Sequence, residues 1–310
     1  MRSPETHSKE FAQAVRSLAV GCALIALLFS IPLFEWVVLG LRSDTESYLL
    51  LIPPISLYLI WTRKESIPLE AGGSRSAAAA WGLAGGIGAA LYLASVGNDF
   101  PLRRPDALTL GIAAVVCLVN AVAAATLGPG TRKALRFPLL FLFFSIPMPH
   151  AVLESLEIAL QHSSAEVTDW LFSATQLPHL RDGLVFQLPG ISIRVAQECS
   201  GVRSTLVLFI TSIVGGYLML NTTTNRIVLV LATWALGIFR NAVRILVIAW
   251  LCVEKGPHMI SSPIHTHGGP LFFSVSLLPL GGLLWLMVRM ESRRRSSRPE
   301  APAPEASRTP

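Results

Sequence analysis

Long apolar runs recur along the chain, each closed by basic or turn-forming residues. Eight of them lie at about 18–41, 48–61, 77–96, 107–127, 137–148, 205–220, 227–253 and 271–290. Backbone N–H and C=O groups find no water in a bilayer, so such runs satisfy their hydrogen bonds as helices. Charged residues make up only 14% of the chain, whereas soluble proteins usually have about 25%. We therefore expect an all-α polytopic membrane protein with about eight transmembrane helices.

Three stretches depart from this simple pattern. The run at 48–61 is short and contains two adjacent prolines, so the number of crossings around 48–62 is open. Residues 152–172 place acidic side chains between apolar ones at helical spacing, which predicts an amphipathic helix on the outer face instead of a simple span. Residues 184–195 alternate around a Pro-Gly pair, which predicts a short β-hairpin or extended loop.

The same pattern divides the chain into three segments. We expect a cytoplasmic N-terminal segment at 1–16, a transmembrane domain at 17–290, and a disordered tail at 291–310 that is basic and Pro-rich. The transmembrane domain holds all the apolar runs. No separate soluble domain is expected.

Basic residues indicate how the chain is threaded. They close four of the runs, at 63–75, 132–136, Arg226 and 293–298. All four groups lie on the cytoplasmic side if both termini are cytoplasmic, as the positive-inside rule favours. This accounts for the net charge of +6 without nucleic-acid binding. We expect an integral protein of the cytoplasmic (inner) membrane, with the helix at 152–172, the hairpin and Cys199 on the outer, periplasmic face.

A polar stretch, Glu198-Cys199-Ser200-Gly201-Val202-Arg203-Ser204, begins the sixth run. Cys199 lies just before a predicted helix, whose N-terminus would favour the thiolate. No Cys-x-x-Cys spacing occurs, so we expect neither a metal site nor a cofactor. Cys199 is therefore a candidate nucleophile. Arg203 either positions this loop, binds substrate or extends to the membrane interface.

Two further groups lie in the predicted outer half of the protein. Arg240 and Arg244 are four residues apart inside an apolar run, and therefore share one helical face. An arginine there costs about 2.5–3.5 kcal/mol on insertion scales and usually faces a partner or a wet cavity. His265 and His267 precede the last run. A histidine can move the thiol proton, and an arginine can stabilise an oxyanion, so the three groups suffice for acyl transfer.

These residues resemble the exosortase/archaeosortase family of membrane transpeptidases. Cys199-Ser200-Gly201-Val202-Arg203 follows the family pattern, Asn241-Ala242-Val243-Arg244 is similar to its Asn-x-x-Arg element, and His265 with Gly269 to its His-x-x-x-Gly element. The resemblance implies that Cys199 is the nucleophile, Arg244 the oxyanion or substrate-positioning residue, and His265 the general acid/base, with His267 as a competitor. We assign supporting or substrate-binding roles to Glu198, Ser200, Arg203, Arg240, Asn241 and His267.

The resemblance also implies the partners. Members of this family process exported proteins that carry a C-terminal sorting signal: a short motif such as Pro-Glu-Pro, one transmembrane helix and a basic cluster. The signal is cut through a thioester and the new C-terminus passes to an acceptor, which the sequence does not identify; hydrolysis is the alternative outcome. From the residues alone, the rival interpretation is a polytopic transporter or channel in which Arg240 and Arg244 line an anion path.

Overall fold

Helices dominate the computed structural model, which describes residues 4–43, 45–97, 102–196, 200–261 and 269–296. Its strands, among the described residues, form one small sheet. The chain divides into two units, Met1–Glu154 and Ser155–Pro310. The prediction of an all-α polytopic membrane protein with a short hairpin is confirmed.

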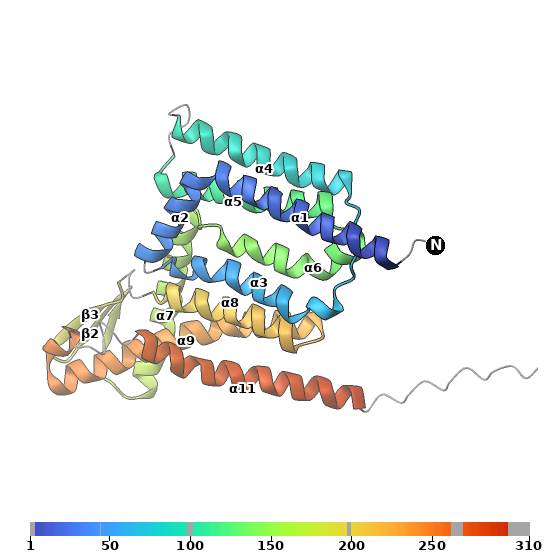
Figure 1. The fold of residues 1–310 in the computed structure, drawn as a ribbon. Helices are drawn as coiled ribbons and strands as arrows, with labels where there is room; N and C mark the ends of the chain where they lie inside the picture. Colours follow the sequence, from blue (N-terminus) through green and yellow to red (C-terminus); the bar gives the residue numbers. More distant parts are fainter. Residues whose placement is uncertain (1–3, 44, 98–101, 197–199, 262–268, 297–310) are drawn as a thin grey trace, which may run out of the picture. The chain divides into compact units, whose positions relative to one another are not determined.

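The first unit is a bundle in which α5 contacts α4, α1 and α2, and α3 contacts α6. Figure 1 shows α1, α4 and α5 running alongside one another. The packing is close because α4 is rich in small residues: a Cβ on Gly85 would lie 2.8 Å from Cγ of Leu118 in α5. The elements are α1 (Pro4–Leu28), α2 (Ser30–Arg42), η1 (Ser47–Leu51), α3 (Ile52–Thr62), η2 (Lys64–Ser66), α4 (Arg75–Val96), α5 (Arg104–Thr126), α6 (Pro129–Phe141) and η3 (Leu142–Ser145).

The first predicted span, at about 18–41, is divided between two helices. α1 ends at Leu28 and α2 begins at Ser30. Pro32 explains the break, because a proline has no N–H to donate to the carbonyl of Leu28 four residues earlier. The sequence-based boundary missed this because the residues on both sides of the break are equally apolar.

The second unit contains the small sheet and the helices that pack with it. Its elements are α7 (His150–Ala174, which begins at the end of the first unit), β1 (Leu180–Asp182), β2 (Val185–Leu188), β3 (Ile191–Arg194), α8 (Val202–Met219), α9 (Thr223–Lys255), η5 (Pro257–Ser261) and α11 (Gly269–Ser296). The strands are antiparallel in the order β1-β2-β3. The predicted hairpin is confirmed, and β1 is an additional strand. α7 confirms the helix expected at 152–172.

The sheet is held in place by one apolar cluster. Phe186 of β2 pairs with Ile193 of β3, and both are buried. They pack with Phe172 of α7 and with Ile245 and Ala249 of α9. α8, α9 and α11 contact one another and run side by side (Figure 1). The alternation of apolar residues in the hairpin thus serves to bury one of its faces between two helices.

Six of the described helices are long and apolar enough to cross a membrane. A seventh span results if Pro129–Ser145 and His150–Ala174 are counted as one bent pair, and Ser47–Thr62 is a shorter apolar helix. The expected number of about eight counted the runs at 48–61 and 137–148 as spans, but not the helix at 152–172. The six are Glu10–Leu28, Arg75–Val96, Arg104–Thr126, Val202–Met219, Thr223–Lys255 and Leu271–Arg294.

A single carboxylate ties the end of α11 to the turn between α8 and α9. Glu291 is 7% exposed and accepts five hydrogen bonds. The donors are the backbone N–H (2.8 Å) and Nδ2 (3.2 Å) of Asn221, the backbone N–H (3.1 Å) and Oγ1 (2.6 Å) of Thr222, and Nδ2 of Asn225 (2.7 Å). Two of these donors are backbone groups at the start of α9, where a helix favours a negative charge.

Glu291→Ala should therefore lower the free energy of unfolding by about 3 kcal/mol, because it leaves several donors without an acceptor. Asn225→Ala is the matched control and should cost about 1 kcal/mol, because it removes one of the five hydrogen bonds. Unfolding of the purified protein in detergent, followed by circular dichroism, measures both. Equal losses in the two variants would show that the Glu291 carboxylate contributes no more to stability than a single hydrogen bond does.

Candidate functional site

A left-handed turn at Gly201 connects the sheet to α8. Gly201 has φ of 74° and is the N-cap residue of α8, which begins at Val202. A glycine adopts this conformation without the steric cost that a Cβ brings. A Cβ here would also lie 2.9 Å from Oδ1 of Asn241 and 3.0 Å from Nη2 of Arg240. Both the backbone conformation and the neighbouring side chains therefore require glycine at this position.

The carbonyl oxygen of Gly201 is a meeting point for α8 and α9. It accepts hydrogen bonds from the backbone N–H (3.0 Å) and Oγ1 (2.9 Å) of Thr205 and from Nη2 of Arg240 (3.2 Å). The two helices approach closely there, because a Cβ on Gly237 would lie 2.7 Å from Oγ1 of Thr205. The Gly201 turn is thus fixed by the backbone of its own helix and by a cation on the neighbouring one.

Arg240 supplies a buried positive charge next to this turn. The residue is 8% exposed, and its Nη1 is buried with no hydrogen-bond partner in the described part of the chain. Burying a guanidinium group is costly unless its donors are satisfied. Its burial beside the Gly201 turn makes Arg240 suited to holding that turn and to meeting a negatively charged or carbonyl oxygen.

Asn241 connects the same turn to α7. Its Nδ2 donates to Oγ of Ser164 at 3.1 Å, and Asn241 and Ser164 are both almost fully buried. One turn earlier on α7, Nε2 of Gln161 donates to the carbonyl oxygen of Val195, which follows β3, at 2.5 Å. The polar face of α7 therefore holds both the strand that leads into the site and the helix that carries the arginines.

The structure brings together part of the predicted set. Of the predicted residues, Arg240 and Asn241 meet at the Gly201 turn, and Ser200, which precedes that turn, is buried. Arg244 is half-buried one turn further along α9, whereas Arg203 is exposed on the first turn of α8. Four predicted residues lie outside the described residues, so their roles remain predictions: Glu198, Cys199, His265 and His267.

A histidine–carboxylate pair that sequence analysis did not single out anchors β1 to α7. Nε2 of His179 lies 3.0 Å from Oδ1 of Asp169, and its Nδ1 lies 2.9 Å from the carbonyl oxygen of Leu177. The ring also packs between Phe172 and Phe186. These contacts give His179 a structural role. Its spacing in the sequence carried no signal, because the pairing depends on the chain reversal after α7.

An arginine strengthens the same anchor. Arg181 of β1 forms two hydrogen bonds with Glu166 of α7, at 2.9 and 2.6 Å, and lies over the ring of Phe186. The hydrogen bond to Glu166 raises the pKa of Arg181. In the described ranges, no group of three His, Cys, Asp or Glu side chains is placed to hold a metal ion.

Comparison with known proteins identifies the chain by family. Residues 36–282, well over half of the chain, match the family model described as transmembrane exosortase. The match includes the Gly201 turn and the part of α9 that carries the two arginines. No curated protein and no solved structure matched the chain.

Gly201→Ala should lower the free energy of unfolding by about 3 kcal/mol, since it adds overpacking to an unfavourable φ. Gly190→Ala is the matched control. Gly190 also has a positive φ, 81°, but a Cβ there would meet nothing within 4 Å. The control should cost only about 1 kcal/mol, because the backbone term alone remains. Denaturant unfolding in detergent measures both, and equal losses would contradict the close contact with Arg240 and Asn241.

Proposed function

The chain belongs to the transmembrane exosortase family, and from that premise we propose that it is a membrane-embedded cysteine transpeptidase. Family membership supports a membrane transpeptidase role in protein sorting. The finer proposal is that Cys199 cleaves the C-terminal sorting signal of exported proteins at the outer face and transfers them to an acceptor. The observation that carries it is the contact of the Gly201 turn, in the first family element, with Asn241 of the second element and with Arg240, which precedes it.

The proposed reaction has two steps. In the first, the Cys199 sulfur attacks the carbonyl carbon of the scissile peptide bond, and a thioester forms as the C–N bond breaks. His265 takes the thiol proton and gives it to the leaving amine. In the second, the acceptor's nucleophile attacks the thioester carbonyl, loses its proton to His265, and frees the thiol. Water in place of the acceptor gives hydrolysis.

The described residues support this chemistry in three ways. α8 begins at Val202, three residues after Cys199, and the positive end of its dipole favours a nearby thiolate. The left-handed turn at Gly201 fixes the chain directly after the cysteine. Arg240 and Arg244 are four residues apart on one face of α9, and we assign Arg244 to the oxyanion of the tetrahedral intermediate.

The proposed site lies on the outer face of the inner membrane, with both termini in the cytoplasm. The basic clusters at 63–75 and 132–136 support this orientation through the positive-inside rule. A substrate with a short motif followed by a transmembrane helix would then present the motif at the outer face, where the proposed nucleophile is.

The transporter interpretation is less well supported than the transpeptidase one. It assigns Arg240 and Arg244 to the lining of an anion path. Arg240 instead donates to the carbonyl oxygen of Gly201 at 3.2 Å and packs against this turn. Family membership supports the transpeptidase interpretation over the transporter one.

Cys199→Ala in the native cell should leave a set of exported proteins with uncleaved C-terminal membrane tails, because the thioester cannot form. Mass spectrometry of the C-termini of exported proteins measures this and reads the cleavage site directly. Cys22→Ala is the matched control, since it removes a half-buried thiol of α1, in the other unit. Unchanged C-termini, with the variant present in the membrane at normal levels, would rule out Cys199 as the nucleophile.

The two histidines should respond differently to substitution. His265→Ala should reduce processing at least 100-fold, in line with the usual contribution of a general acid/base, and His267→Ala by less than tenfold. Quantifying cleaved and uncleaved substrate in membranes from each variant makes the comparison. The reverse order would assign the proton transfer to His267, and equal mild losses would remove it from both.

A further inference from the structure

A cavity of about 440 Å³ opens between α4, α5 and α6 of the first unit. Its polar lining comes mainly from one turn of α6, which carries Arg132, Lys133 and Arg136. Trp81 of α4 and Leu140 of α6 supply apolar lining, and Asn120 of α5 is buried at its wall. The cavity is separate from the proposed active site, which is in the other unit.

The cavity gathers three cationic side chains, those of Arg132, Lys133 and Arg136. Among the described residues, none of them forms an ion pair. Nε of Arg132 is buried and has no hydrogen-bond partner in the described structure. Three like charges within five residues repel one another, and a buried N–H without an acceptor costs free energy. An anion in the cavity would relieve both.

The attraction comes from these side chains and not from the start of α6. That helix end is already occupied, because Oε2 of Glu70 accepts a hydrogen bond from the backbone N–H of Gly130 at 2.6 Å. Oγ1 of Thr131 is also engaged, donating to the carbonyl oxygen of Pro68. The basic turn that follows is left to face the cavity.

Apolar residues next to the cations indicate what kind of anion fits. Leu140 is 39% exposed, and Trp81 is half-buried at the same cavity. A free inorganic anion gains nothing from contact with this apolar surface, whereas an amphiphile buries the surface under an acyl chain. The basic residues at 132–136 are also those that the positive-inside rule places at the cytoplasmic leaflet, where anionic lipids gather.

We propose that this cavity is a binding site for an anionic phospholipid. The headgroup phosphate lies against Arg132, Lys133 and Arg136, and an acyl chain lies along Trp81 and Leu140. The guanidinium groups donate charge-assisted hydrogen bonds to the phosphate oxygens, which satisfies Nε of Arg132.

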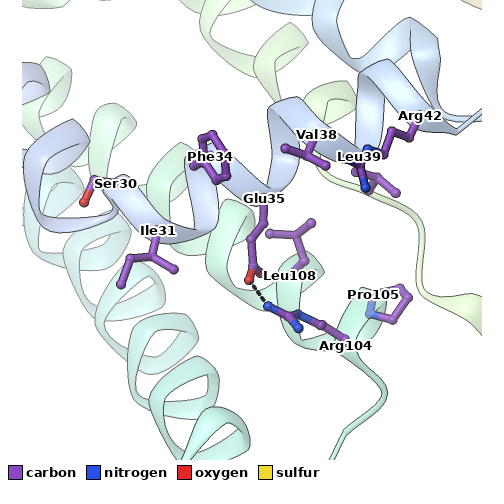
Figure 2. Close-up of a pocket in the computed structure, with 10 residues that line it drawn as sticks. All are labelled: Ser30, Ile31, Phe34, Glu35, Val38, Leu39, Arg42, Arg104, Pro105 and Leu108. Carbon is purple, nitrogen blue, oxygen red and sulfur yellow. Dashed lines mark hydrogen bonds and ion pairs between the residues drawn. The ribbon is translucent and has the colours of Figure 1, made fainter.

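A larger cavity in the same unit shows that apolar lining together with arginine is not enough to indicate an anion-binding site. That cavity, of about 730 Å³, lies along α2 and the start of α5 (Figure 2). One of its two arginines, Arg104, already has a counter-charge, because its Nη2 lies 2.5 Å from Oε1 of Glu35 (Figure 2). An anion there would have to compete with a carboxylate of the protein.

The test is lipid binding by the full chain purified in a neutral detergent. Phosphatidylglycerol is titrated in mixed micelles, and binding is followed by native mass spectrometry and by the rise in unfolding temperature. We expect tighter binding of phosphatidylglycerol than of phosphatidylcholine. Arg132→Gln and Arg136→Gln should each weaken phosphatidylglycerol binding about fivefold. Arg16→Gln, which removes one exposed charge from α1, should leave binding within about twofold.

Each other outcome would overturn the proposal in its own way. Equal weakening by Arg16→Gln would show attraction by overall charge alone. Equal binding of phosphatidylcholine would show that the phosphate charge is not recognised. An equal rise in unfolding temperature with inorganic phosphate, lost in Arg132→Gln, would make this a site for free phosphate. If Arg132→Gln does not fold, Arg136→Gln carries the comparison, and unchanged binding in that variant would refute the site.

Discussion

A polar group that leaves water has to find its partner inside the protein, and in the second unit such partners converge on the turn at Gly201. Its carbonyl oxygen takes donors from Thr205 and Arg240, while the side chains around it leave no room for a Cβ. A strand, a turn and two helices are therefore fixed relative to one another by a few hydrogen bonds. These bonds are partly shielded from solvent, so losing one partner leaves the other poorly satisfied.

The ends of α8 and α9 are held by different physical means. Near the Gly201 turn, small residues such as Gly237 let the helix backbones approach closely. At the opposite end, the carboxylate of Glu291 gathers donors from the turn between the helices and brings α11 against it. α9 is thereby held at its start and near its middle, which suits a helix whose arginines must keep their positions.

Charge has two separate tasks in this protein. In the second unit, the buried Arg240 of α9 contacts the turn at Gly201, inside the cysteine motif. In the first unit, the basic turn of α6 faces a cavity and lacks a counter-charge among the described residues. Orientation by the positive-inside rule and recognition of an anionic headgroup would both come from the same attraction between basic residues and the cytoplasmic leaflet.

The sequence by itself determined the class of fold, because a backbone in hydrocarbon has few ways to satisfy its hydrogen bonds. It also predicted the hairpin, from alternation around a Pro-Gly pair. It placed Gly201 in the cysteine motif and gave Arg240 and Asn241 supporting or substrate-binding roles. Tertiary structure alone decided the third strand, the His179–Asp169 pair and the carbonyl oxygen that Arg240 meets. Those depend on contacts between residues far apart in the chain, and periodicity reports which face of a helix is apolar but not which partner that face will meet.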